Sequence, residues 1–373
     1  MAYLGENIPK LGFGLMRLPM QGDAIDIGQV KEMTDRFMAA GFRYFDTAYG
    51  YNNGKSEEAA KAALVDRYPR DSFYLATKLP AWAGPKTAEE AKAMFDTSLR
   101  RTGAGYFDFY LLHNLGGKRS KFFDDYGIWD YVQEKKAAGL IRHVGFSFHD
   151  EADVLEEILT KHPEMEFVQL QINYIDWESN SVQSRRCYEV ARAHGKPIVI
   201  MEPVKGGNLA SLPESAAGVL RRADPEASLS SWAIRFAASL PGVITVLSGM
   251  SSIEQMDDNL KTMKDFKPLS EREREVIREA TEALEAVPRI PCTGCQYCMK
   301  GCPQHINIPG IFNAVNTNLV YGNLKGATGG YFFATMEGGK AGDCVGCGQC
   351  ERVCPQHIGV VEELKKAKEL FGK

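Results

Sequence analysis

The sequence predicts an α/β protein, a (β/α)8 TIM barrel followed by a small, mainly helical domain that is rich in cysteine. Between residue 11 and about residue 260, short apolar runs alternate with amphipathic stretches of helix length, as in repeated strand–helix units around a parallel sheet. Beyond Pro288 the composition changes, because eight of the nine cysteines lie between Cys292 and Cys354. We therefore expect residues 1–287 to form the barrel and residues 288–373 to form the second domain.

The composition narrows the class of protein further. Of the 373 residues, 44% are hydrophobic and 25% are charged, which is typical of a globular chain, and the formal net charge of -4 argues against a nucleic-acid partner. No apolar run approaches the roughly 18 residues that span a bilayer, and the N-terminus lacks the pattern of a secretory signal. We expect no membrane partner and a cytoplasmic location with reduced thiols.

Eight segments of the first region have the length and apolar character of strands. They are Leu11–Met16, Tyr44–Asp46, Phe73–Thr77, Phe107–Leu112, His143–Ser147, Phe167–Gln171, Pro197–Met201 and Val243–Ser248. Eight strand–helix units favour a closed barrel over an open sheet. A Rossmann-like sheet is the main alternative, but no G-x-G-x-x-G follows the first strand and no G-x-x-x-x-G-K-[ST] occurs.

Three further segments are predicted to be helical. The stretch from Ser270 to Val287 is rich in Glu and Arg, with Ser270 as a candidate N-cap and Pro288 as its stop. Both the last helix of the barrel and a separate linker helix stay open for it. In the second domain, residues 307–322 and a Lys/Glu-rich segment from about residue 360 to 371 have helical patterns.

The clustered cysteines form two copies of one motif, C-x2-C-x2-C-x3-C-P. This is the bacterial ferredoxin spacing, in which three cysteines of a run bind one 4Fe-4S cluster and the fourth binds the other cluster. Crossed ligation predicts one cluster on Cys292, Cys295, Cys298 and Cys354, and a second on Cys302, Cys344, Cys347 and Cys350. Zinc fingers use paired C-x2-C units instead, and reducing conditions oppose disulfides. The domain resembles the two-cluster ferredoxin modules that are fused to oxidoreductases.

Polar residues stand where barrel strands end, which is where barrel enzymes place their chemistry. Asp46 ends the second predicted strand, Lys78 follows the third and His113 follows the fourth, while Tyr51 lies in the loop after Asp46. Taken singly, each has an ordinary structural explanation, such as a cap, a solvated cation, a local hydrogen bond or packing. Lone Cys187, in a helical stretch, is interpreted as a small packing residue.

Together these four residues predict a general acid. The ordinary pKa of tyrosine, about 10, is high for proton donation at neutral pH, but a Lys78 ammonium beside Tyr51 is expected to lower that pKa. Asp46 would hold Lys78, and His113 would orient a carbonyl or complete a proton relay. Such a site protonates an alkoxide as hydride arrives at carbon.

At these residues the sequence resembles the aldo/keto reductase superfamily, whose catalytic tetrad is Asp, Tyr, Lys and His in this order. The resemblance covers about residues 8 to 262 and includes LGFGLMRLP, DTA-x-x-Y, ATK, YLLH, GLIRHVGFS and VQLQINY. The whole chain resembles the iron-sulfur branch of that superfamily. The resemblance implies a nicotinamide cofactor bound without a Rossmann fold and the reduction of a small-molecule carbonyl.

The resemblance also implies a cofactor site. On matching positions, Ser147 and Gln169 contact the nicotinamide carboxamide and Asn259 contacts the adenine. The same site includes the strand-end residues Met201, Ser248 and Gly249.

This part of the sequence departs from the family pattern. Phe148 and His149 stand where the family usually has asparagine, and Met201 replaces the stacking tyrosine. Gly249 and Gln255 occupy the positions of a lysine and an arginine that hold the 2'-phosphate of NADPH. NADH, NADPH, weak binding and a different electron source therefore all stay open.

Three functional hypotheses follow. In the first, the tetrad reduces a carbonyl and the clusters transfer electrons. Because nicotinamide delivers two electrons at once and a 4Fe-4S cluster passes one, a ferredoxin or flavoprotein partner would join the two. In the second, the barrel no longer binds nicotinamide and serves as the scaffold of an electron-transfer protein. In the third, the clusters are purely structural.

Overall fold

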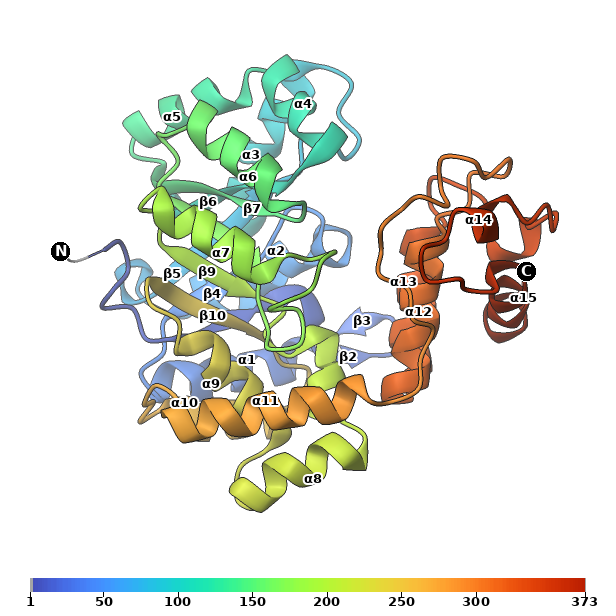
Figure 1. The fold of residues 1–373 in the computed structure, drawn as a ribbon. Coiled ribbons are helices and arrows are strands. Elements are labelled where there is room, and N and C mark those ends of the chain that lie inside the picture. The colour runs from blue at the N-terminus through green and yellow to red at the C-terminus, as the bar shows by residue number, and fades with distance from the viewer. Residues whose placement is uncertain (1–2, 373) are drawn as a thin grey trace. The chain divides into compact units, whose positions relative to one another are not determined.

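The computed structural model describes residues 3–372 and contains a closed barrel of parallel strands (Figure 1). The strand order is β1-β10-β9-β8-β7-β6-β5-β4, and β1 pairs with β4 to close the ring. The strands are β1 (Leu11–Gly14), β4 (Tyr44–Asp46), β5 (Tyr74–Leu79), β6 (Phe107–Leu115), β7 (Ile141–Phe148), β8 (Phe167–Gln171), β9 (Ile198–Met201) and β10 (Val243–Gly249). The predicted barrel is therefore confirmed.

Helices surround the barrel, since each parallel crossover needs a connection that returns along the sheet. They are α1 (Ile27–Ala39), α2 (Lys55–Ala60), α3 (Ala88–Thr102), α4 (Gly117–Asp125), α5 (Ile128–Ala137), α6 (Ala152–Lys161), α7 (Ser184–Ala193), α9 (Leu229–Ala238) and α10 (Ile253–Met263). A short hairpin of β2 (Met20–Gln21) and β3 (Ala24–Ile25) precedes α1 and was not predicted. Within residues 3–372, no helix is both long and apolar enough to cross a membrane.

Several strands have other bounds than predicted. The first strand stops at Gly14, and a 3-10 turn, Leu15–Arg17, follows it. Lys78 lies inside β5 because its strand stays paired with β6 through Leu79. His113 likewise lies inside β6, which runs to Leu115 and pairs there with β7. Both side chains are thus fixed by strands and not by loops.

The barrel interior is filled by side chains that alternate with outward-facing ones along each strand. The buried interior cluster is Ile8, Tyr44, Ala76, Phe109, Leu111, Phe167, Val199, Ile244 and Leu247. Two residues beyond a member of this cluster, the same face of the strand carries a polar group. Asp46 follows Tyr44 in this way, Lys78 follows Ala76, and Gln169 follows Phe167. The barrel interior therefore has an apolar layer and, next to it toward the C-terminal ends of the strands, a polar layer.

The outer core packs the helices onto the barrel. In α1, Val30, Met33 and Phe37 are buried at helical spacing. The Phe37 ring meets the rings of Phe13 and Phe45 from β1 and β4, with centroids 5.8 and 5.1 Å apart. Burying one such side chain contributes about 1.5–3 kcal/mol, so this contact is a main anchor of the helix.

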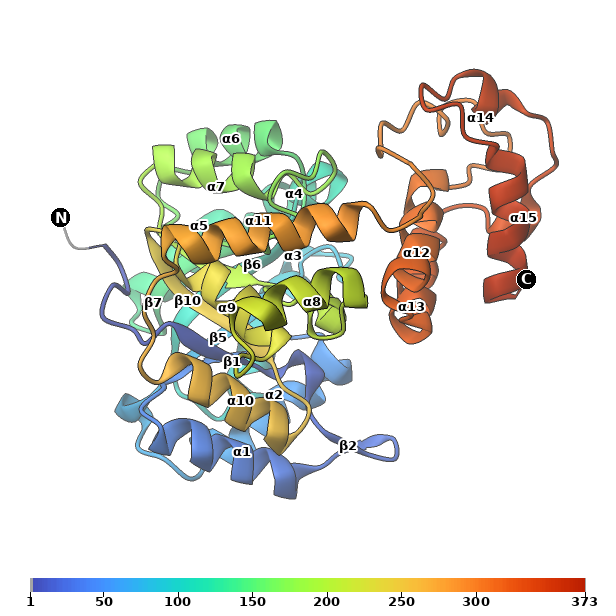
Figure 2. The same ribbon diagram turned by 60° about the horizontal axis from the view of Figure 1, so that its bottom comes forward.

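The chain divides into two compact units. The first contains the chain up to Val204 together with Ser230–Ser270, and the second contains Lys205–Leu229 and the chain from Glu271 onward. In the second unit, α11 (Glu271–Glu285) packs along α8 (Glu214–Ala223) (Figure 2). The charged helix predicted after Ser270 is thus present. The predicted domain boundary at residue 288 stays a prediction.

The cysteine-rich region of the second unit is mainly helical. Its helices are α12 (Ile308–Tyr321), α13 (Leu324–Ala334), α14 (Gln349–Arg352) and α15 (Val360–Phe371), and α12 packs against both α13 and α15. Asn307 caps α12, because its side chain accepts a hydrogen bond from the Gly310 amide at 3.1 Å. A separate apolar core, which includes Ile311, Phe312 and Leu364, holds these helices together.

Candidate functional site

The structure brings Asp46, Lys78 and Tyr51 together at one end of the barrel. The Lys78 side chain is fully buried, and its Nζ donates hydrogen bonds to Asp46 Oδ1 at 2.5 Å and to the Thr47 carbonyl at 2.7 Å. The same nitrogen lies 3.4 Å from the Tyr51 hydroxyl. The His113 ring lies edge-on to the Tyr51 ring, with centroids 5.9 Å apart. All four predicted tetrad residues therefore occupy one site.

Tyr51 is held by an unusual turn. The turn runs over Tyr51–Gly54, and Asn52, Asn53 and Gly54 have positive φ angles of 49°, 56° and 86°. Asparagine and glycine tolerate the left-handed region better than other residues, so the sequence Asn-Asn-Gly suits this turn. A methyl group added at Gly54 would lie 2.7 Å from the guanidinium carbon of Arg101, so a larger residue would displace the Arg101 side chain.

A buried ion pair lies beneath this turn. Glu57 is fully buried and accepts hydrogen bonds from Thr77 Oγ1 at 2.8 Å and from Arg101 Nη1 at 3.3 Å. The same Arg101 nitrogen donates to the Tyr49 carbonyl at 3.0 Å. The pair links α2, β5 and α3 to the loop that carries Tyr51. Sequence reasoning missed it, because nothing local separates Glu57 from exposed Glu58.

The pKa of Tyr51 is shifted in the direction opposite to the one expected from the sequence. Burial raises the pKa of Tyr51 above its ordinary value, and the opposing effect of the Lys78 ammonium is smaller. The expectation that Lys78 lowers this pKa below its ordinary value is therefore wrong, since desolvation of the phenolate outweighs the attraction. Burial also acts to lower the pKa of Lys78, but the charges of Asp46 and Tyr51 raise it, so Lys78 stays charged.

His113 is neutral at the site. Burial, followed by the positive charges of Lys78 and Arg119, lowers the pKa of His113 well below its ordinary value. A neutral imidazole has one donor and one acceptor nitrogen, which suits an oxygen that gains and loses a proton. The His113 carbonyl accepts a hydrogen bond from Trp82 Nε1 at 2.8 Å, which fixes the end of β6.

Two of the predicted nicotinamide contacts lie beside the tetrad. Ser147 and Gln169 are paired in register on β7 and β8. Gln169 Nε2 donates to Asp46 Oδ2 at 3.2 Å, and Ser147 Oγ accepts from the Asn114 amide at 2.8 Å. Met201 is the last residue of β9, the strand next to β8.

The other predicted cofactor residues lie around the end of β10. Asn259 Nδ2 donates to Ser248 Oγ at 2.8 Å, and both side chains are buried. Gly249 is packed by Arg17, because a methyl group added there would lie 3.3 Å from the Arg17 Cδ. Arg17 also forms an ion pair with Glu202 at 3.6 Å. A cation from a distant turn therefore lies next to Gly249, and no spacing in the sequence indicated it.

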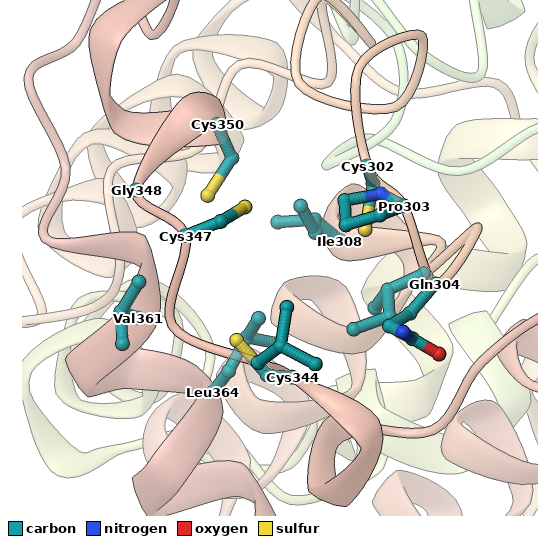
Figure 3. Close-up of a pocket in the computed structure, with 12 residues that line it drawn as sticks. Cys302, Pro303, Gln304, Ile308, Cys344, Cys347, Gly348, Cys350, Val361 and Leu364 are labelled. Atoms are coloured by element: carbon teal, nitrogen blue, oxygen red, sulfur yellow. The ribbon is translucent and has the colours of Figure 1, made fainter.

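The cysteines line two separate pockets of the second unit. One pocket is lined by Cys302, Cys344, Cys347 and Cys350, which surround a common space in Figure 3. The other is lined by Cys292, Cys295, Cys298 and Cys354. Each pocket therefore takes three cysteines from one run and the fourth from the other run. Apolar side chains of α12 and α15 complete both walls, including Ile308, Leu364 and Val360.

The cysteines of each set are distributed around their pocket. Among residues 3–372, no three His, Cys, Asp or Glu side chains converge on a point that could hold a single metal ion. All nine cysteines lie in the described part of the chain and are free. Sulfurs spread around a pocket suit a cluster, in which each thiolate binds its own iron. Cys187 is apart from them and buried, and burial raises its pKa to about 12.

Comparisons with known proteins find two families in the chain. The model of the aldo/keto reductase family matches residues 10–282, and that of the 4Fe-4S dicluster domain matches residues 291–358. An aldo-keto reductase of Mycolicibacterium smegmatis is 31% identical over 147 residues, 38% of this chain and 47% of that protein. The chain thus spans about half the length of that relative. The uncharacterised oxidoreductase YqkF of Bacillus subtilis is 24% identical over 74% of this chain and 94% of that protein.

Solved structures give the same family. The holo form of aldo-keto reductase AKR11C1 from Bacillus halodurans has a TM-score of 0.61 and 27% identity, and covers 74% of this chain and 93% of its own. An aldo-keto reductase from Klebsiella pneumoniae in complex with NADPH, at 20% identity and a TM-score of 0.56, covers 74% of this chain and 92% of its own and shares the fold. Because the family model covers well over half of the chain, this protein belongs to the aldo/keto reductase family.

Proposed function

We propose that this protein is an oxidoreductase that reduces a small-molecule carbonyl compound with a nicotinamide cofactor and uses Tyr51 as the general acid. The observation that carries the proposal is the chain of contacts from Asp46 through Lys78 to the Tyr51 hydroxyl, at 2.5 and 3.4 Å. Buried residues hold these three side chains in place, and a barrel without a catalytic function would not require such an arrangement.

Each residue of the tetrad has a separate task in the proposed reaction. Nicotinamide, when bound, supplies hydride to the carbonyl carbon. Tyr51 donates its proton to the carbonyl oxygen as the C=O π bond breaks, so that C–H and O–H bonds form and an alcohol results. The Lys78 ammonium stabilises the phenolate left behind, and Asp46 keeps that ammonium in place. Neutral His113 donates a hydrogen bond to the oxygen before transfer, and solvent returns the proton to Tyr51.

The residues present fit a nicotinamide cofactor. Ser147 and Gln169 have polar side chains in register on adjacent strands, next to Asp46. Arg17 supplies a cation beside Gly249, close to the start of α10. An arginine binds a phosphate through two parallel hydrogen bonds, so a phosphate of NADH or NADPH would share Arg17 with its ion-pair partner Glu202 or replace that partner.

We also propose that the two cysteine pockets hold two 4Fe-4S clusters with crossed ligation. The division of the eight cysteines into two sets of four supports this, as does the match to a dicluster domain. Clusters of this kind transfer single electrons. A ferredoxin or flavoprotein partner is therefore proposed as the converter between the clusters and a two-electron donor. Thiol ligation suits the reducing cytoplasm that the sequence leads us to expect.

An anaerobic titration tests the proposal. The intact protein is purified without oxygen and mixed with NADH or NADPH, and binding and oxidation of the cofactor are followed with a panel of aldehydes and ketones. We expect saturable binding of at least one nicotinamide and turnover that disappears in Tyr51→Phe. Turnover retained in that variant would mean that another group is the acid.

A second function is supported by one observation. Gln255 is uncharged, and its Oε1 accepts a hydrogen bond from the Ser251 amide at 2.8 Å, so it offers no cation to a phosphate. An electron-transfer protein with a barrel scaffold would explain this. If neither nicotinamide binds at millimolar concentration while dithionite still bleaches the clusters, the reductase proposal fails and this second function replaces it.

A further inference from the structure

The segment where β6 passes into α4 contains an unusual group of polar atoms. His113 Nδ1, Asn114 Oδ1 and Arg119 Nε are all buried and make no hydrogen bond with the described residues. These three residues lie within the seven residues 113–119, which begin with His113 of the tetrad. Buried polar atoms are nearly always hydrogen-bonded, so a group of unpartnered ones next to a candidate active site points to a ligand.

Arg119 is the charged member of this group. Its side chain is half-buried, yet no Asp or Glu among residues 3–372 forms an ion pair with it. Comparable arginines of the barrel are paired, since Arg101 contacts Glu57 and Arg142 contacts Asp108. A half-buried guanidinium without an anion is costly, and the cost is offset when a ligand supplies the negative charge.

The charge balance near the tetrad favours an anion as that ligand. The Lys78 ammonium is compensated by Asp46, and Arg17 is compensated by Glu202. Burial and the charge of Lys78 lower the pKa of His113 most, and the positive charge of Arg119 adds to their effect. One uncompensated positive charge therefore remains beside the groups that act on the carbonyl.

We propose that Arg119 binds a carboxylate of the substrate, so that the substrate class is the oxo acids, which carry a carbonyl and a carboxylate on one short carbon chain. The inference rests on the proposed function and narrows its substrate. The guanidinium presents two parallel N–H donors that match a carboxylate. The carbonyl end faces Tyr51 and His113, and reduction by hydride and a proton gives the hydroxy acid.

A second feature of α4 suits the carbon chain of such a substrate. Phe122 stands one helical turn beyond Arg119, on the same face, and 37% of its surface is exposed. An exposed phenyl ring beside a guanidinium combines an apolar contact with a charged one. The two residues therefore fit a ligand with an apolar stem and an anionic end.

Paired substrates test the inference. Steady-state kinetics of the intact, anaerobically purified protein are measured with oxo acids of two to five carbons and with their methyl esters, which keep the carbonyl and lack the charge. We expect Arg119→Gln to lower kcat/KM for the best oxo acid by about 10- to 100-fold, mainly through KM, and to change that for its ester by less than about threefold. Arg119→Lys should have an intermediate kcat/KM for the oxo acid, because it keeps the positive charge and loses the two parallel N–H donors of the guanidinium.

Lys118→Gln is the matched control, because Lys118 is the exposed neighbour on the same helix and the charge change is identical. Succinate, which cannot be reduced, gives an independent readout of binding by calorimetry, and its affinity should fall in Arg119→Gln and not in Lys118→Gln. If Arg119→Gln lowers kcat/KM equally for the acid and the ester, the inference is overturned while the reductase proposal stands. The same holds if Arg119→Gln and Lys118→Gln have equal effects. Absence of turnover with every compound and both nicotinamides would overturn the reductase proposal and the inference together.

Discussion

The barrel and the cysteine-rich region build their sites in opposite ways. In the barrel, Asp46 and Lys78 come from different strands, 32 residues apart, and meet because the alternation of two strands puts both on the inner face. In the cysteine-rich region the candidate ligands are neighbours in the sequence, and only the fourth of each set comes from far away. One site is thus created by the fold, and the other by local spacing that the fold completes.

The two sites also differ in what holds them together. Hydrogen bonds and burial already fix the tetrad, including the buried Glu57–Arg101 pair beneath Tyr51. The eight cysteines of the two pockets lie beside a small apolar core, and all of them except Cys350 of α14 are outside helices. Because metal binding and folding are coupled where ligands lack other support, we expect this region to depend on the proposed clusters for its stability more than the barrel does.

Removal of the proposed acid should have the largest effect. We expect Tyr51→Phe to lower kcat for carbonyl reduction by about 10²- to 10⁴-fold, since it deletes the proton donor and keeps the ring. Cofactor affinity, measured by fluorescence titration, and iron content should be unchanged. A variant that also lost iron would break the separation between the two regions.

Breaking the buried Asp46–Lys78 ion pair should lower both the stability of the barrel and its activity. Lys78→Met leaves Asp46 buried without its partner, and we expect the barrel to lose about 3–5 kcal/mol of unfolding free energy, measured by urea denaturation. The double variant Asp46→Asn/Lys78→Met removes both charges and should recover much of the stability without recovering turnover. If the double variant is no more stable than the single one, the pair is not the source of the loss.

Under crossed ligation, replacing one cysteine should have a smaller effect, which is confined to one cluster. Cys354→Ala removes the fourth ligand from the pocket of Cys292, Cys295 and Cys298. We expect the iron content to fall by about half, while the barrel keeps its thermal transition. Cys187→Ala is the control and should leave the iron content unchanged. Loss of iron from the pocket of Cys344 alone would contradict the crossed arrangement.

The smallest effect is expected from pH. Reduction requires protonated Tyr51, and burial raises the pKa of Tyr51, so the donor is lost only as pH rises through a value above about 10. It also uses neutral His113, whose lowered pKa means that protonation sets in only well below about pH 6.5. We therefore expect kcat to be nearly constant from about pH 6.5 to 10. A pronounced change near pH 7 would show that another group titrates.

The sequence predicted the barrel well because eight alternating units carry a strong periodic signal, and the bounds of seven of the eight strands differ by two residues or fewer at each end. It also predicted which polar residues share a site, since their positions follow from where strands end. It missed Arg17, Glu57 and Arg119, because their roles depend on contacts between distant segments. It predicted the wrong direction for the Tyr51 pKa, since burial is a property of the fold and not of the pair of residues.

The crossed cysteine sets have a consequence for biosynthesis. All cysteines of the first run are present once Cys302 has been translated, but the pocket of Cys292, Cys295 and Cys298 lacks its fourth thiol until Cys354 has been translated. The pocket of the second run needs Cys302 from the first, together with cysteines that are added some forty residues later. Neither set is complete on a nascent chain that stops before residue 350. Under the proposed crossed ligation, assembly of either iron-sulfur cluster therefore follows the translation of the whole barrel sequence.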